Sequence, residues 1–192
     1  EGLVYDFFEE SMVRSAPAEP ADRWVISCDY GTVNPTSMGL WGQKGGVWYR
    51  TAEFYYDSRK TGRQQTDGEY ADDLARLAGG RDIRGVGLDP SAASFREELI
   101  RRGWMVYRAE NEVLSGIRRT AELLRAGQLV ICSPCEDAIR EFGLYRWDTA
   151  ATGDRVVKEH DHAMDDIRYF AVTVAGRRSE GFFAGAVERG GG

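Results

Sequence analysis

The sequence predicts an α/β domain built on a mixed sheet. Three β-rich segments come first, at residues 24–30, 36–43 and 46–56, and only short connections separate them. Short connections between adjacent strands give an antiparallel meander. Segments with helical and with strand periodicity then alternate, which is typical of parallel strands joined by crossover helices. We therefore expect a three-stranded antiparallel meander that is extended by parallel strands and flanked by helices.

The meander is predicted from residue type and from one turn. Residues 24–30 are apolar and β-branched, as expected of a buried strand. The sequence Lys44-Gly45-Gly46 is a hairpin turn signal between the second and third strands. The third strand, which ends near residue 56, is rich in aromatic and β-branched residues, so it fits a pleated and partly buried surface.

The later elements are predicted from caps, apolar stripes and glycine stops. A capping box begins at Thr66, and the glycine pair at 79–80 ends that helix. A second capping box at 133–136 predicts a helix that reaches about residue 145. The other expected elements are strands at 83–88, 104–107 and 128–132, helices at 92–102, 113–126 and 161–175, and a loop or hairpin at 147–160.

Length and composition indicate one globular domain in a reducing compartment. The chain has 192 residues, 42% of them hydrophobic and 29% charged, which is enough for a sizeable core. No apolar run approaches about 20 residues, so we expect no membrane span. Three cysteines are an odd number and do not form a disulfide framework. The net charge of −6 is unusual for an enzyme of nucleic acids, but bound divalent cations and local arginines would offset it.

We divide the chain into a lead-in at 1–22, a main domain at 23–178 and a tail at 179–192. Prolines make residues 16–21 resemble a linker, and the aromatic residues before it predict that the first stretch docks on another surface. The glycine-rich end is expected to be disordered. The chain begins without a secretory signal. It also begins without an initiator Met, which we interpret as a processed form or an excised fragment.

Three aspartates end or begin elements where an active site can form. Asp29 closes the predicted strand at 24–30, Asp89 closes the one at 83–88, and Asp165 lies in the first turn of the last helix. Ligands of α/β sheets bind at the carboxyl ends of strands. Two carboxylates at about 4 Å repel by roughly 4 kcal/mol at an effective dielectric of about 20. Divalent metal relieves such repulsion, because hard cations prefer oxygen ligands. Singly, each acid is also explained as a turn residue or as a partner of the helix dipole.

Neighbouring residues add to this cluster. His162 and Asp165 are spaced i and i+3, so they share one face of the helix. His162 is a candidate to ligate metal, to orient Asp165 or to contact a scissile phosphate. Asp166 points about 100° away and is expected to be a supporting or an exposed charge. Lys158 is a candidate phosphate contact, and its alternative is a solvated lysine.

Two other motifs do not carry a function. Cys132 and Cys135 form a C-x-x-C pair, and His160 and His162 lie downstream. The gap between the histidines is too short for a zinc-finger pair, so we do not predict zinc. No phosphate-binding loop of the G-x-x-x-x-G-K-[ST] type occurs, so this chain should not hydrolyse ATP by that route.

Four sequence motifs together suggest a family. They are Asp29-Tyr30-Gly31 followed by Pro35-Thr36, Gly87-Leu88-Asp89-Pro90, Ser115-Gly116-Ile117, and the most specific block, which runs from Lys158 to Tyr169. With these motifs, about residues 24–175 resemble the C-terminal nuclease domain of the large terminase subunit of tailed bacteriophages. The resemblance implies a ribonuclease-H-like fold and an endonuclease that cuts concatemeric double-stranded phage DNA during genome packaging.

The resemblance also implies site residues and a mechanism. The family's three metal-binding acids match Asp29, Asp89 and Asp165, and its histidine matches His162. They imply two divalent ions, Mg²⁺ or Mn²⁺, with Asp29 shared between them, and cleavage that leaves 5′-phosphate ends. The family usually has alanine where this chain has Asp166, which leaves open which of the two adjacent aspartates is the ligand.

Partners and location follow from the same resemblance. They are double-stranded DNA, an upstream ATPase domain of the same protein, the small terminase subunit and the portal, in the cytoplasm of an infected bacterial host. We hypothesise that the loop at 147–160 gates the site, because it lies directly before His162. The alternatives are a junction resolvase or transposase on the same fold, and a non-catalytic docking module. A docking module would use exposed aromatic residues such as Trp41, Trp48 and Tyr56.

Overall fold

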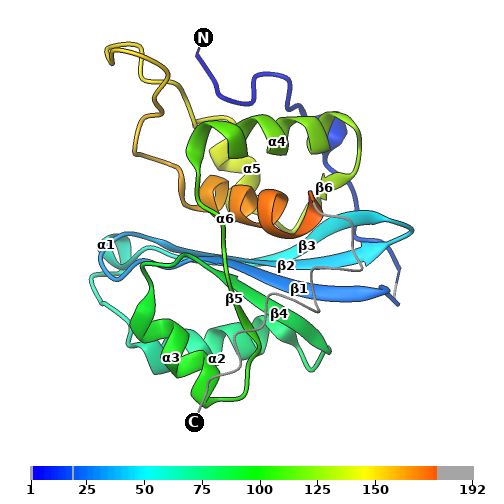
Figure 1. The fold of residues 1–192 in the computed structure, drawn as a ribbon, viewed down its shortest axis with the longest axis vertical. Helices are drawn as coiled ribbons and strands as arrows, with labels where there is room; N and C mark the ends of the chain where they lie inside the picture. Colours follow the sequence, from blue (N-terminus) through cyan, green and yellow to red (C-terminus); the bar gives the residue numbers. More distant parts are fainter. Residues whose placement is uncertain (1, 19, 177–192) are drawn as a thin grey trace.

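The computed structural model describes residues 2–18 and 20–176, and the strands in this part of the chain form a six-stranded sheet with the order β5-β4-β1-β2-β3-β6 (Figure 1). The first three strands pair antiparallel, β4 and β5 continue the sheet in parallel beside β1, and β6 lies parallel to β3. The predicted mixed sheet is therefore confirmed. The strands are β1 (Arg23–Asp29), β2 (Thr36–Lys44), β3 (Val47–Tyr56), β4 (Ile83–Leu88), β5 (Val106–Arg108) and β6 (Leu129–Ile131).

Helices cover both faces of the sheet, and each face has its own apolar core (Figure 1). One face carries α4 (Val113–Arg125), α5 (Glu136–Phe142) and α6 (His162–Phe170), and the other carries α2 (Asp67–Ala78) and α3 (Ala93–Arg101). The remaining helical segments are the short α1 (Ser58–Thr61), η1 (Glu10–Met12) and the π-helical η2 (Ala171–Ala175), which extends α6. No helix of the described residues is long and apolar enough to cross a membrane.

The two predicted capping boxes had different outcomes. At α2 the Thr66 side chain accepts a hydrogen bond from the amide of Glu69 at 3.2 Å, as predicted. At α5 the prediction was wrong, because the helix begins at Glu136 and its N-cap side chain makes no capping bond. Glu53 of β3 supplies the cap instead, and it accepts from the amides of Asp137 at 2.7 Å and Ala138 at 3.3 Å.

The lead-in packs onto the sheet face that carries α5. Val4 and Tyr5 are buried in that core, and the Val4 amide donates to the carbonyl of Tyr145 at 2.9 Å. The Phe8 ring stacks on Phe142 with centroids 3.8 Å apart. The first stretch thus docks, as its aromatic residues predict. The division at residues 22 and 23 stays a prediction, and the predicted tail at 179–192 lies outside the described residues.

Two of the three aromatic residues considered as docking contacts lie in the core. Trp41 is fully buried and stacks on Phe170 with centroids 4.0 Å apart, and Trp48 is 5% exposed. These two side chains therefore hold α6 and its extension on the sheet and are not available to a partner. Tyr56 is partly buried, and its hydroxyl donates to the carbonyl of Arg63 at 2.6 Å.

The segment before α6 folds as a hairpin. Trp147 and Val156 form an antiparallel bridge, and the Asp148 amide donates to the carbonyl of Arg155 at 2.7 Å. Gly153 lies at its predicted tip with a φ of +90°, a conformation that favours glycine. The hairpin places residues 158–161 directly before the first turn of α6.

Candidate active site

The register of the sheet places Asp29 beside Asp89. In the parallel pair of β1 and β4, Cys28 is aligned with Leu88, and each aspartate is the next residue of its chain. Neighbouring strands lie about 4.8 Å apart. The two carboxylates therefore leave the sheet at the same carboxyl edge, where ligands of α/β sheets bind.

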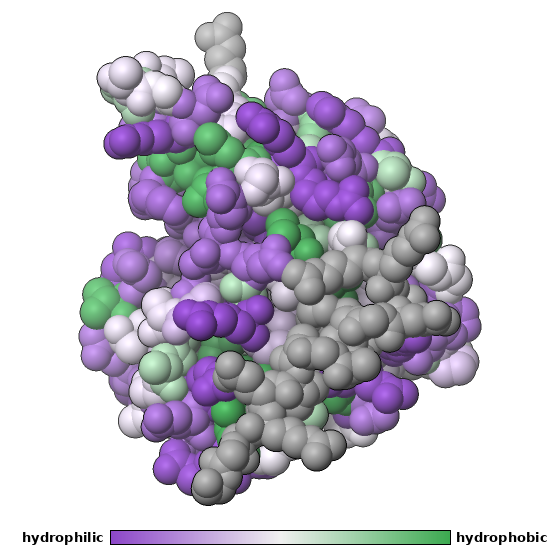
Figure 2. All heavy atoms as spheres, in the orientation of Figure 1, coloured by the Kyte–Doolittle hydropathy of each residue, from purple (hydrophilic) through white to green (hydrophobic). Residues whose placement is uncertain are grey.

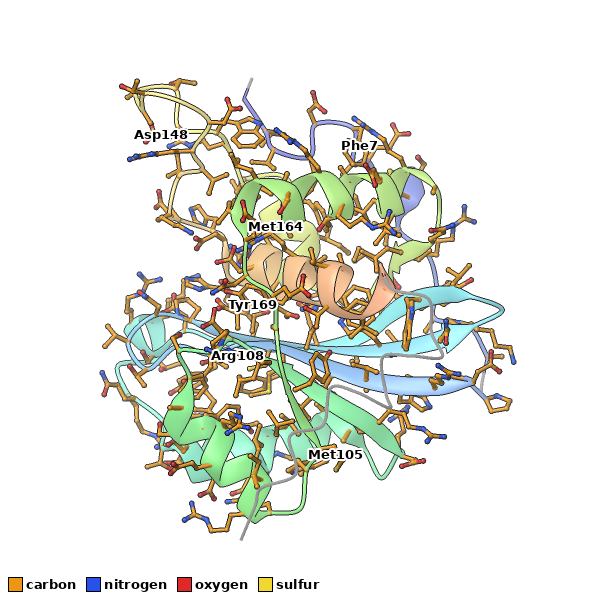
Figure 3. The ribbon with its side chains drawn as sticks, in the orientation of Figure 1. Phe7, Met105, Arg108, Asp148, Met164 and Tyr169 are labelled. Atoms are coloured by element: carbon orange, nitrogen blue, oxygen red, sulfur yellow. The ribbon has the colours of Figure 1, made fainter. Side chains whose placement is uncertain are left out.

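Asp29 is held by side chains of α6. Its Oδ2 lies 3.0 Å from Nδ1 of His162, and its Oδ1 lies 3.5 Å from the hydroxyl of Tyr169. Figure 3 shows Tyr169 between α6 and the sheet. The side chains of Asp29 and His162 are only 15% and 16% exposed. The first and last turns of α6 thus both reach the end of β1.

The pKa values of Asp29 and His162 are both shifted by burial and by the charges around them. Burial raises the pKa of Asp29 to about 7, the hydrogen bond from His162 opposes the rise, and the charge of Asp165 adds to it. Burial by itself lowers the pKa of His162, but the hydrogen bond and charge of Asp29 outweigh it, so that pKa is raised. The proton near neutral pH therefore belongs to the Asp29–His162 pair and not to one residue.

Asp165 is held by a buried arginine of the same helix. Arg168 donates from Nη2 to Oδ1 of Asp165 at 3.0 Å. Its Nη1 donates to the carbonyls of Asn111 at 2.7 Å and Glu112 at 2.9 Å, just before α4. Gly116 of α4 makes room for this side chain, because a Cβ there would lie 2.8 Å from Cγ of Arg168. Arg168 thus joins the predicted acid to the start of α4.

Asp89 is held by its own turn. Ser91 donates from its amide at 2.7 Å and from its hydroxyl at 2.6 Å to Oδ1 of Asp89. Burial alone would raise the pKa of Asp89, but the hydrogen bonds from Ser91, Tyr169 and Asn111 together outweigh it and hold that pKa below its usual range. Asp89 lines a cavity of about 390 Å³ together with Arg96 and Arg108.

Asp166 does not reach this edge. Its side chain is fully buried and forms an ion pair with Arg50 of β3 at 2.9 Å. It also accepts hydrogen bonds from the hydroxyls of Ser27 and Ser37. The charge of Asp166 is therefore a supporting one, and the expected alternative of an exposed charge was wrong.

A larger cavity of about 530 Å³ joins most of the predicted site. Asp29, His162, Asp165 and Lys158 line it, and Asp89 does not. Figure 2 shows a hollow with hydrophilic surroundings at the left edge of the molecule, at the level of the sheet. The cations Arg59, Lys60 and Arg140 line the same cavity.

The acids do not form a ready metal cage. Among the described residues, no group of three or more His, Cys, Asp or Glu side chains is placed to hold a metal ion. In this structure Asp29, Asp89 and Asp165 are instead each satisfied by a protein donor. Their chemistry nevertheless fits Mg²⁺ or Mn²⁺, because carboxylate oxygens are the ligands that these hard cations prefer.

Solved structures of phage proteins resemble this chain. The large terminase of the thermophilic bacteriophage D6E, in complex with ADP, is 40% identical, with a TM-score of 0.87 over 90% of this chain and 45% of the D6E chain. Over 90% of its length, the chain is therefore similar in sequence and in fold to a large terminase. It spans less than half the length of the D6E protein. No family model and no curated protein matches the sequence.

The terminase nuclease domains of two other phages share the fold. The P22 large terminase nuclease domain has a TM-score of 0.71 at 19% identity, over 87% of this chain and 89% of that domain. The large terminase nuclease of the thermophilic phage G20c, with bound magnesium, has a TM-score of 0.61 at 16% identity, over 89% of this chain and 97% of the G20c chain. The chain therefore has the ribonuclease-H-like fold.

Apart from Asp166, the predicted site residues lie at one edge of the sheet, in two cavities. Lys158 lines the larger one with a side chain that is 66% exposed, and its Nζ is 3.9 Å from Asp161, so both expectations for it remain. The sequence did not single out Glu141, whose carboxylate reaches the first turn of α6. No local pattern marks that contact, because the two partners are 22 residues apart.

Proposed function

We propose that this chain is a metal-dependent endonuclease that cuts double-stranded viral DNA during genome packaging. The observation that carries the proposal is the edge of the sheet, where Asp29 and Asp89 lie side by side and Asp165 and His162 join Asp29 around one cavity. The P22 and G20c neighbours are terminase nucleases by name, and G20c structures hold cobalt or magnesium. Fold and donor chemistry thus support the same reaction class.

Two divalent ions, Mg²⁺ or Mn²⁺, held by Asp29, Asp89 and Asp165, would supply an activated water and stabilise the leaving 3′ oxygen. The chain's own residues have other tasks. Arg168 keeps Asp165 at the cavity, and His162 and Tyr169 fix the two oxygens of Asp29. The hairpin at 147–160 leads into the cavity wall and stays the predicted gate.

Cations around the site would bind the DNA backbone. Lys158 and Arg140 line the larger cavity, and Arg96 and Arg108 line the one at Asp89. Phosphate contacts of this kind dominate affinity and make it salt-dependent. They would overcome the acidic net charge locally, with little preference for base sequence.

The partners follow from the length of the relatives. The D6E large terminase extends beyond the part that this chain covers, and it has been solved with ADP. We therefore propose that an ATPase domain precedes this one in the same protein. The small terminase subunit and the portal would complete the packaging machine in the cytoplasm of an infected bacterial host.

The decisive experiment is plasmid cleavage. Supercoiled plasmid is incubated with the chain and Mg²⁺, Mn²⁺ or EDTA, alongside Asp89→Ala and Asp165→Ala, each checked for folding. Asp82→Ala is the matched control, because its carboxylate is 88% exposed and lies before β4. We expect metal-dependent nicking that EDTA and both site variants abolish and the control retains. Equal cutting by all variants would reveal a contaminant and remove the support for the site.

A further inference from the structure

Helix α6 begins without a cap of its own. Its N-cap residue Asp161 makes no side-chain capping bond, and the preceding His160 has a φ of +54°, in the left-handed region. The first amides of a helix have no intrahelical partner and need one when they are buried. Ala163 and Met164, both buried, follow His162 in this first turn.

Glu141 of α5 provides the missing partner. Its Oε1 accepts from the amide of Ala163 at 2.8 Å and lies 3.4 Å from the amide of Met164. Its Oε2 accepts from the hydroxyl of Tyr55 on β3 at 3.1 Å. The Glu141 residue is fully buried, so this carboxylate has no role at the surface. A side chain from another helix thus sets where α6 starts.

The position of this cap determines where two site residues stand. His162 directly precedes the capped amides, and Asp165 follows them within the same turn. The remaining charged anchors of α6 lie further along the helix, at Asp166 and Arg168. Fraying of the first turn would therefore move His162 away from Asp29 while the rest of the helix stayed on the sheet.

We propose that Glu141 is a positioning residue that holds His162 against Asp29 by capping α6 from outside. The assignment of His162 to catalysis rests on the proposed nuclease function. The positioning itself rests on the contacts above. It is therefore measurable without any cleavage assay.

Histidine NMR tests the positioning directly. The chain has only two histidines, so labelling them gives two imidazole spectra, and His160→Gln assigns them. In the wild type at alkaline pH, we expect the proton of His162 on Nδ1, which faces Asp29. Glu141→Ala should shift it toward Nε2. Glu141→Asp withdraws the carboxylate by one methylene and should cause the same shift. It replaces the alanine variant in the test if that variant fails to fold. Glu141→Gln keeps an acceptor and should retain the wild-type spectrum.

A matched control separates positioning from stability. Thr66→Ala removes the side-chain cap of α2 on the other face of the sheet, so it should lower stability without changing the His162 spectrum. Mn²⁺ affinity, measured by calorimetry, should fall about 10-fold in Glu141→Ala and stay unchanged in Thr66→Ala. An unchanged His162 spectrum in both Glu141→Ala and Glu141→Asp would overturn the proposal. Absence of metal binding and cutting by the wild type would refute the nuclease function instead, and the NMR outcome would still decide the role of Glu141.

Discussion

The ion pair between Arg50 and Asp166 should be worth several kcal/mol to the fold, although neither residue faces the cavity. Both side chains are 0% exposed, and Nη2 of Arg50 lies 2.9 Å from Oδ2 of Asp166. Removal of one partner from a buried pair costs about 3–5 kcal/mol when it leaves an uncompensated charge. In Asp166→Ala, Glu53 remains 3.4 Å from Arg50 and two serine hydroxyls lose their acceptor, so we expect a loss near the lower end of that range.

Urea unfolding followed by tryptophan fluorescence measures this loss, because the chain has five tryptophans. A double-mutant cycle completes the argument. Arg50→Met should also cost about 3–5 kcal/mol, since it leaves Asp166 charged and buried. The double variant should cost at least about 2 kcal/mol less than the sum of the singles, because neither Arg50 nor Asp166 is then left without the other. Losses below about 1 kcal/mol, or simple additivity, would show that the pair is not what anchors α6.

A comparison of Asp165→Asn with Asp166→Ala separates the two adjacent aspartates by function. Asp165→Asn keeps an acceptor for Arg168, which also retains the carbonyls of Asn111 and Glu112, so its stability should fall less than that of Asp166→Ala. Its Mn²⁺ affinity should fall steeply if Asp165 is a ligand. Asp166→Ala should show the reverse, with lower stability and little change in metal affinity for the folded protein. Swapped results would make Asp166 the ligand.

Three further outcomes are expected. Burial raises the pKa of Glu141 from 4.5 to about 7, so the folded state holds a proton that the unfolded state has lost. The free energy of unfolding should therefore fall as pH rises between these values, by up to about 3 kcal/mol. Glu141→Gln should flatten this part of the pH profile, measured by urea unfolding, and an unchanged profile would contradict the prediction. Gly116→Ala should lower the melting temperature, at a cost of about 1–3 kcal/mol, because the new Cβ would meet Arg168; a gain, the usual effect of alanine in an open helix, would show that the contact relaxes. Arg108→Ala should reduce the salt slope of DNA binding by about one, measured by anisotropy in Ca²⁺, whereas Arg84→Ala at the other end of β4 should not.

Where contacts are local, the sequence predicts the structure closely. The strand at 83–88 has its predicted bounds, and Thr66 caps α2 as the spacing of its capping box requires. Cap, turn and strand signals depend on residues a few positions apart, so a single sequence contains them. The capping box at 133–136 is the exception, because a tertiary contact from Glu53 replaces it.

Where contacts are tertiary, the sequence does not contain them. The caps of α5 and α6 come from Glu53 and Glu141, at 84 and 22 residues from the amides that they accept. Helical spacing separates Asp165 from Asp166 by about 100° but does not say which one faces the core. The ion pair with Arg50 holds Asp166 in the core. Nothing in the sequence near β3 marks that arginine as the buried partner of α6.

Buried charged contacts to α6 explain how several acids can stay close together at the carboxyl edge of the sheet. Glu141 from α5 holds the first turn, Arg50 from β3 holds the middle, and Arg168 reaches back to the residues before α4. Each contact is buried, so solvent screens it little. Carboxylates that repel one another would otherwise push α6 away from the end of β1. These contacts therefore oppose that repulsion, and they leave the oxygens of Asp29 and Asp165 at the cavity, where cations can bind them.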